Sequence, residues 1–87
     1  MAKSITISRV AADLQVSKAR SMGKSKGFTI TRSADGMPRF TRRDADIFVK
    51  GAVWVFVSYT LDIHRDRALV VQTKSHFDLF VLFRSII

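Results

Sequence analysis

The feature that most constrains this chain is a run of β-branched and aromatic residues over 52–63, Ala-Val-Trp-Val-Phe-Val-Ser-Tyr-Thr-Leu-Asp-Ile. This composition predicts a β-strand, whose side chains alternate between the two faces of a sheet. The valines share one face and the aromatic residues the other: Val53, Val55 and Val57 against Trp54 and Phe56. Both faces are therefore apolar. In a chain of 87 residues the helices can cover only one of them, so we expect a second protomer to cover the other.

The residues after this run predict two more strands. Polar residues His64–Arg67 form a loop, Ala68–Thr73 a strand and Lys74–His76 a turn. The apolar segment Phe77–Phe83 then predicts a third strand. The second half of the chain is thus expected to be a three-stranded antiparallel meander.

The first half predicts two short helices before any strand. Thr6 or Ser8 caps a helix over residues 8–15, whose apolar face holds Val10, Ala11 and Leu14. A break at Gln15-Val16 follows, and Ser17 is a natural N-cap for a second helix, from Lys18 to about Lys24. That second helix is weakly apolar, which indicates that it presents most of its surface outward.

A hairpin and another helix are expected next. Phe28–Ser33 alternates with period two, residues 34–37 carry an Asp-Gly turn, and Pro38–Arg43 returns. The apolar side chains of this hairpin that are available for its inner face are Phe28, Ile30 and Phe40. Thr41 then caps a short helix with Asp44 at its N3 position, and Gly51 ends it.

These elements predict an α+β fold, with a winged helix-turn-helix followed by a three-stranded antiparallel β meander. Residues 1–50 are the expected winged helix-turn-helix module. Residues 51–87 are the expected β-rich core and oligomerisation extension.

Three segments of the first half occur together in one known kind of domain. They are Ile7-Ser-Arg-Val-Ala-Ala-Asp-Leu-Gln-Val-Ser17, Gly27-Phe28, and Ser33-Ala-Asp-Gly-Met-Pro-Arg-Phe-Thr-Arg-Arg-Asp-Ala-Asp-Ile47. Their order over about residues 5–49 resembles the winged helix-turn-helix domain of MerR-type regulators and phage excisionases. The resemblance implies a bacterial or phage DNA-binding protein, either a transcription regulator or an excisionase-like architectural factor. The aromatic pair of the family's second helix is replaced here by Ser21, Met22 and Gly23.

Charge is distributed unevenly along the chain. Residues 1–43 carry ten of the fifteen Lys and Arg residues and two of the seven acidic residues, so the whole formal charge of +8 belongs to the first half. Such asymmetry favours a polyanion-binding half. Each Lys or Arg taken singly is equally well explained as an ordinary solvated surface charge.

The resemblance places the second helix in the major groove, so it implies where the DNA contacts lie. Lys18, Arg20 and Ser21 are the candidates for base edges, Arg20 above all, because Arg pairs bidentately with guanine. The other expected contacts are with phosphates or the minor groove, through Ser17 at the helix start, Lys24, Lys26, Arg32, Arg39, Arg42 and Arg43. Six to eight phosphate contacts predict an affinity that falls about a thousandfold between low and moderate salt.

Other chemistries have little support in the sequence. The chain has no Cys and two His, so we expect no metal site, no cofactor and no enzymatic activity. The run 52–63 is too short and too polar to span a bilayer, and the polar first residues show no secretory signal. A cytoplasmic, nucleoid-associated location is expected, with double-stranded DNA as partner and a homo-oligomer formed by the C-terminal strands.

Three alternatives stay open. One is a small metal-dependent nuclease, in which Asp46 or Asp62 precedes Gln72 and Lys74. Another is a phage-type protein that binds a host protein through its apolar sheet. RNA is a third, although the basic half lacks solvent-facing aromatic residues for stacking unpaired bases.

Overall fold

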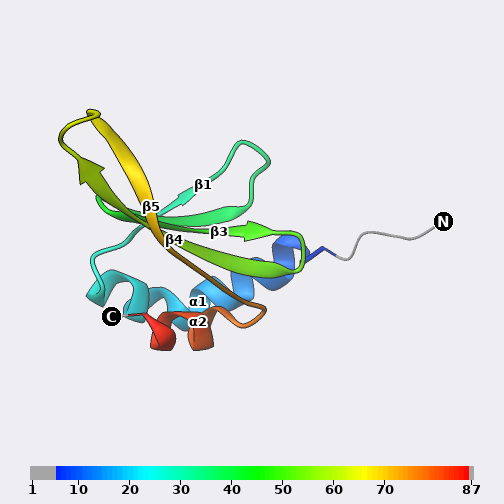
Figure 1. The fold of residues 1–87 in the computed structure, drawn as a ribbon. Helices are drawn as coiled ribbons and strands as arrows, with labels where there is room; N and C mark the ends of the chain where they lie inside the picture. Colours follow the sequence, from blue (N-terminus) through cyan, green and yellow to red (C-terminus); the bar gives the residue numbers. More distant parts are fainter. Residues whose placement is uncertain (1–5, 87) are drawn as a thin grey trace.

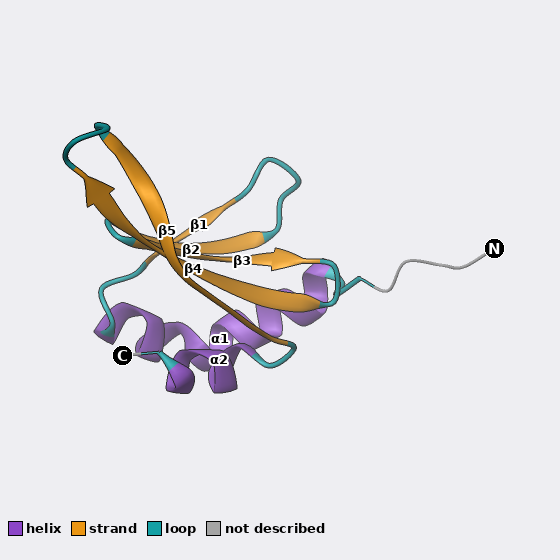
Figure 2. Cartoon of the chain, viewed as in Figure 1, coloured by secondary structure: helices purple, strands orange, loops and turns teal. Residues whose placement is uncertain are grey.

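The computed structural model describes residues 6–86. It consists of one long helix, five strands and a short second helix (Figures 1 and 2). In chain order the elements are α1 (Arg9–Ser25), β1 (Thr29–Arg32), β2 (Pro38–Arg42), β3 (Ala45–Lys50), β4 (Val53–Asp62), β5 (Arg67–His76) and α2 (Leu79–Ser85).

All five strands form one antiparallel sheet in the order β1-β2-β3-β4-β5, so each strand pairs with its neighbour in the sequence. Both helices lie on the same side of this sheet (Figure 2). The face beneath the helices carries the buried side chains Phe40, Ile47, Trp54 and Phe56. We call the opposite face, on which the described residues place no helix, the outer face.

The predicted winged helix-turn-helix is wrong, because residues 9–25 form a single helix. Ser8 caps it, with its side chain accepting from Ala11 N at 3.1 Å. Ser17 is not a cap; its Oγ donates to the carbonyl of Asp13, one turn earlier. Nothing at Gln15-Val16 breaks a helix, and Val16 is buried. The apolar face predicted from Val10, Ala11 and Leu14 is wrong as well, because Val10 and Leu14 are 71% and 61% exposed. The residues of α1 that are buried lie on one continuous stripe on another side of the helix.

That stripe explains how α1 packs. Its buried residues, Ala12, Val16, Ala19 and Gly23, recur every three or four positions and are mostly small. Small side chains let the helix backbone come close to the sheet. At Gly23 the approach is tightest, since a Cβ there would lie 2.6 Å from Cε2 of Phe40 and 3.1 Å from Cζ of Phe83.

The hairpin predicted over residues 28–43 is confirmed as β1 and β2, with Ile30 opposite Phe40 and the second strand beginning at Pro38. Phe28 and Phe40 are buried on the face beneath the helices, and Ile30 packs against them. Phe28, Phe40 and Phe83 meet edge to face, with ring centroids 5.0 to 6.3 Å apart.

The short helix predicted after Thr41 is wrong, because residues 45–50 form β3. Ala45 and Ile47 are buried, whereas Asp46 and Phe48, which alternate with them, are not. This two-residue alternation is the period of a strand. Asp44 does not cap a helix. It lies in the tight β2–β3 turn and binds the guanidinium of Arg42.

The second half was predicted in part. The strand over 52–63 is confirmed as β4, and β5 extends the expected second strand to His76. The third strand is wrong, because residues 79–85 form α2, whose first amide groups are capped by Asp78. Leu79, Leu82 and Phe83 are buried against α1 and the sheet at helical spacing. A three-stranded meander is therefore replaced by a five-stranded one.

Candidate nucleic-acid interface

The acidic residues of this basic protein are almost all used within the fold. Four carboxylates form ion pairs: Asp13 with Arg32 at 3.1 Å, Asp46 with Arg39 at 3.0 Å, Asp44 with Arg42 at 2.5 Å, and Asp62 with Arg65 at 3.8 Å. Asp35 and Asp78 accept hydrogen bonds from their own turns. Each of these carboxylates thus has a partner within the fold, even where it lies at the surface, as Asp13 and Asp44 do. Among the described residues, they do not pair with the remaining cations.

Two lysines also have structural partners. Lys26 Nζ donates to the carbonyl of Ile86 at 3.1 Å, and Lys74 Nζ donates to the carbonyl of Ser85 at 2.6 Å. Both carbonyls belong to the C-terminal end of α2, where cations are favoured by the helix dipole and by the free carbonyl groups. Lys26 is therefore engaged in fastening α2, and it is only partly exposed.

Several exposed cations have no ion pair or hydrogen-bond partner within residues 6–86. These are Arg9, Lys18, Arg20, Lys24, Arg43, Lys50, Arg67 and Arg84. Half of them lie on α1. The only acid on that helix, Asp13, is already neutralised by Arg32.

The unpartnered cations of α1 follow from the register of its buried stripe. Because Ala12, Val16, Ala19 and Gly23 face the sheet, the charged and hydroxyl residues between them face solvent. Counted from Arg9, Arg20 is about three whole turns along the helix and Lys24 about four. These three side chains therefore follow one side of the helix. Lys18, two residues before Arg20, lies about 160° round the helix from it, at the far edge of the exposed surface. We call the exposed polar residues Arg9, Ser17, Lys18, Arg20, Ser21 and Lys24 the α1 surface. The apolar Val10 and Leu14 are exposed between them.

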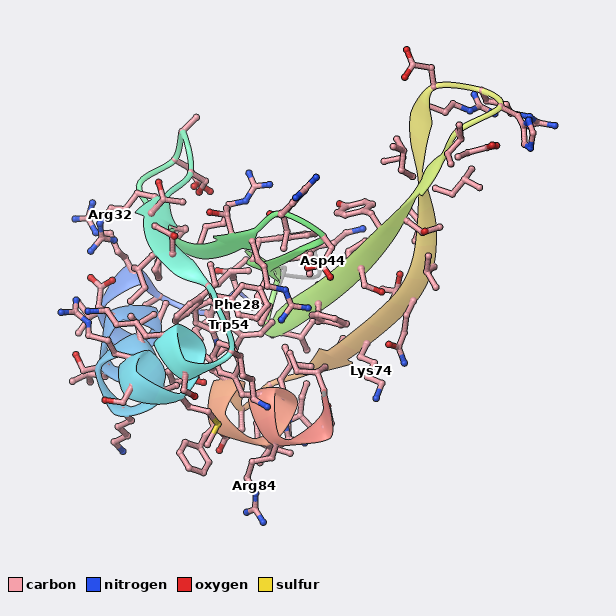
Figure 3. All side chains as sticks on the ribbon, turned by 90° about the vertical axis from the view of Figure 1, so that its left-hand side faces the viewer. Phe28, Arg32, Asp44, Trp54, Lys74 and Arg84 are labelled. Atoms are coloured by element: carbon pink, nitrogen blue, oxygen red, sulfur yellow. The ribbon has the colours of Figure 1, made fainter. Side chains whose placement is uncertain are left out.

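A shallow hollow joins the α1 surface to β1. Its volume is about 390 Å³, and its walls include Ser17 and Arg20 from the helix and Thr31 and Arg32 from the strand. Arg32 lies beside α1, whereas Lys74 on β5 and Arg84 on α2 lie away from it (Figure 3). The guanidinium of Arg32 donates to Gly36 O at 2.7 Å and pairs with Asp13, which fixes its position at the rim.

The structure brings together six of the ten residues predicted to contact DNA. Five lie on the α1 surface and one beside it: Ser17, Lys18, Arg20, Ser21, Lys24 and Arg32. The other four lie elsewhere. Lys26 and Arg42 hold other parts of the fold, Arg39 pairs with Asp46 on the outer face, and Arg43 is exposed in the β2–β3 turn.

Sequence reasoning missed Arg9. The signal was its spacing from Arg20 and Lys24, which has meaning only if residues 9–25 form one helix. The helix predicted over residues 8–15, with a break after it, separated Arg9 from the other two.

The residues proposed for a nuclease do not meet. Asp62 pairs with Arg67 in the sheet, and Gln72 pairs with Ser58, which places Asp62 and Gln72 about 13 Å apart along the strands. Lys74 lies further along β5 and binds the carbonyl of Ser85. Within residues 6–86, no three His, Asp or Glu side chains are grouped so that they can hold a metal ion.

Neither helix in the described part of the chain has the length and apolar character needed to cross a membrane. Comparison with protein-family models, with curated proteins and with solved structures gave no match, so the function is inferred from this chain's own residues.

Proposed function

We propose that this protein binds double-stranded DNA through the α1 surface, without an enzymatic step, in the cytoplasm of a bacterium or of a phage-infected host. The observation that carries the proposal is the separation of charges within the fold. Six of the seven carboxylates have a partner within the fold, while α1 keeps four exposed cations without one. A surface of this kind attracts a polyanion.

The dimensions of α1 suit a duplex backbone. Arg9 and Lys24 are fifteen residues apart, so the cations extend over about 22 Å of helix. A DNA strand carries one phosphate per 3.4 Å of its axis, so several phosphates come within reach of one α1 surface. Hydroxyl groups of Ser17 and Ser21 are exposed between the cations and can donate to phosphate oxygens.

Double-stranded DNA is favoured over single strands because α1 contains no aromatic residue. Single-stranded nucleic acid is usually held by stacking its bases on aromatic side chains. Phe28, Phe40 and Trp54 are buried in the core, and the exposed Phe77 and Phe80 lie outside α1, at the start of α2. Contacts to the backbone of a duplex require only cations and hydrogen-bond donors, which the α1 surface has.

The proposal includes self-association through the C-terminal strands, because one α1 surface is small. Four phosphate contacts give a shallow dependence on salt, with affinity falling about a hundredfold between 50 and 200 mM. This is weaker than the thousandfold expected from six to eight contacts. Two copies acting together raise the affinity without any new type of contact.

The test is a pair of charge-reversal variants with identical net charge. One replaces an α1 cation (R20E). The other replaces an exposed, unpartnered cation on α2, outside both the α1 surface and the outer face of the sheet (R84E). Binding to a labelled duplex is measured by fluorescence anisotropy at low salt. We expect R20E to lose at least about tenfold in affinity and R84E less than about threefold.

Two results would overturn the proposal. Equal losses in both variants would mean that the total charge acts and the α1 surface does not. A wild-type protein that ignores duplex DNA at about 20 mM salt, where phosphate contacts are strongest, would remove DNA binding altogether. Circular dichroism confirms that both variants are folded, which is expected because both side chains are exposed.

A further inference from the structure

We infer that two copies of this chain pack outer face against outer face, and that the resulting dimer presents its α1 surfaces in opposite directions and bridges two duplexes. The dimer rests on the sheet alone, while the bridging rests on the proposed DNA binding. The outer face has an apolar stripe along β3 and β4. Its members are Phe48, Val53, Val55, Val57, Tyr59 and Leu61.

This stripe continues into a part of the sheet that has little support from its own chain. β3 pairs with β4 as far as Ser58, so residues 59–70 form a two-stranded ribbon, which we call the arm. Leu61 and Val70 in the arm are 66% and 63% exposed, and Ile63 at its tip is 83% exposed. A two-stranded ribbon is marginally stable in water unless another element packs on it. The arm therefore has the character of a contact surface.

The outer face is shaped to receive an arm. The arm and the β1–β2 loop both rise from the sheet on the side away from the helices (Figure 1). Hollows of about 490 and 400 Å³ lie beside the stripe, the first lined by Arg43 and Tyr59 and the second by Arg39 and Phe48. Two such concave faces related by a two-fold axis interlock when the sheets cross at a steep angle.

Charge selects this face for contact between two copies. Each copy carries a formal charge of +8, so contact through α1 would oppose unpartnered cations. On the outer face Arg39 is neutralised by Asp46. Within the described residues, two unpartnered cations lie at its margins, Lys50 at the end of β3 and Arg43 in the β2–β3 turn, against four on α1. The arm contains two acids and two arginines and is neutral. Two copies therefore meet here with the least repulsion.

The outer face offers a large part of the area that a dimer needs. Its three neighbouring strands β3, β4 and β5, about 4.8 Å apart, and eight residue steps of about 3.3 Å give roughly 380 Å² of flat surface. The second side of the arm and the walls of the two hollows add to this area. A standard interface buries roughly 800 Å² per partner.

The free edge of β5 is the less suitable surface for pairing. Ser58 faces Gln72 and Tyr59 faces Val70, so Val71 is an extra residue that forms a bulge. A bulge disturbs the hydrogen-bonding edge that another strand would need, and natural sheets use it to block such pairing. Packing through the outer face avoids this obstacle.

The test of the dimer is its mass in solution, measured by light scattering at about 50 µM protein and 0.5 M salt, where charge repulsion is screened. We expect twice the monomer mass of 9.8 kDa. Val55→Glu and Leu61→Glu, both on the outer face, should weaken the dimer at least about tenfold. Val81→Glu on α2 makes the same charge change at an exposed valine on the helix side and should leave the dimer intact.

If Val55→Glu fails to fold, Leu61→Glu still tests the dimer. Leu61 is largely exposed, so its replacement should leave the fold of the monomer intact. A folded wild-type monomer would overturn the inference. A dimer that survives Leu61→Glu, or one that Val81→Glu disrupts equally, would overturn it as well, because another surface would then be responsible. A monomer that instead pairs with a different protein through this face would also contradict the dimer.

Bridging is tested with one duplex fixed to beads and a second, labelled duplex in solution. Wild type should capture the labelled duplex, and Leu61→Glu should bind the fixed duplex yet capture at least about tenfold less of the second. A dimer that binds one duplex and captures no other would overturn the opposed arrangement. If no variant binds DNA, the proposed function fails, while the mass measurement still decides the dimer.

Discussion

The indole Nε1–H of Trp54 donates a hydrogen bond to Oε1 of Gln15 at 3.1 Å. The same oxygen accepts from the amide of Leu79 at 2.8 Å, and Nε2 of Gln15 donates to the carbonyl of Phe77 at 3.4 Å. One side chain of α1 thus links the fully buried tryptophan of β4 to the first turn of α2. Gln15, where the sequence indicated a break between helices, joins the sheet and both helices.

Replacing Gln15 by Leu should lower the free energy of unfolding by about 2 kcal/mol, because the buried indole N–H loses its partner. The measurement is urea unfolding followed by the fluorescence of Trp54, the chain's one tryptophan. Gln72→Leu on the exposed strand β5 is the matched control and should change stability little. Equal effects of the two substitutions would contradict this role of Gln15.

Gly23→Ala should destabilise the protein by about 1–2 kcal/mol, although the same change in an exposed helix stabilises by about 1 kcal/mol. The reason is the distance of 2.6 Å between the added Cβ and the buried ring of Phe40. Ser21→Ala, exposed on the same helix, is the control and should be neutral or slightly stabilising. In a double-mutant cycle, Phe40→Leu should relieve part of the loss. A stabilised Gly23→Ala protein would show that the helix does not press on the ring.

The neighbours Arg42 and Arg43 should behave differently when replaced by Ala. Arg42 binds Asp44 and the carbonyl of Lys26 and lies over the ring of Phe28, 4.6 Å from its centroid. Its loss should cost about 2 kcal/mol of stability, and Lys should not restore it, because Lys lacks the planar fork. Arg43 is exposed without a partner in the described residues, so Arg43→Ala should leave the thermal unfolding midpoint unchanged. Similar midpoints for the two variants would count against this assignment.

The carboxyl of Asp35 should titrate below the usual aspartate value of 3.8, because the Ser33 hydroxyl and then the Met37 amide stabilise its charged form and lower its pKa. A lowered pKa stabilises the β1–β2 loop at pH values above the ordinary aspartate range, and this contribution is lost as the pH falls through the lowered value. Carboxyl NMR shifts give the midpoint. Ser33→Ala should raise it toward 3.8, and an unchanged midpoint would exclude the hydroxyl as the main cause.

The strands with a clear two-residue period were predictable from the sequence. Apolar alternation and an Asp-Gly turn predict the hairpin of β1 and β2, and a run of β-branched and aromatic residues predicts β4. Chain length predicts that helices cover only one face of the sheet, which leaves the valines of β4 on the other. The prediction of a strand at Phe77–Phe83 was wrong because nearly every residue there is apolar. Such a segment fits the two-residue period of a strand and the 3.6-residue period of a helix equally well. There the cap at Asp78 and the spacing of Leu79, Leu82 and Phe83 decide for a helix.

Two other errors came from residues whose role depends on distant parts of the chain. Ala19 and Gly23 are weakly apolar in isolation, and they are buried because the sheet needs a close neighbour at that point. Lys26 was expected at a phosphate, but it binds a carbonyl sixty positions away, which no local pattern shows. Lys18, Arg20 and Lys24 were predicted to be exposed, and they are, because the exposure of a charged residue depends on one helix face alone.

The meander order of the sheet has a consequence for how the chain acquires this shape. Every strand pairs with its immediate neighbour in the sequence, so the sheet grows by closing short loops, whose entropy cost is small. The long closure is the contact of α1 with α2, which joins opposite ends of the chain. Folding should therefore be rapid for a protein so rich in strands, with the hairpins formed early and the two helices docking last.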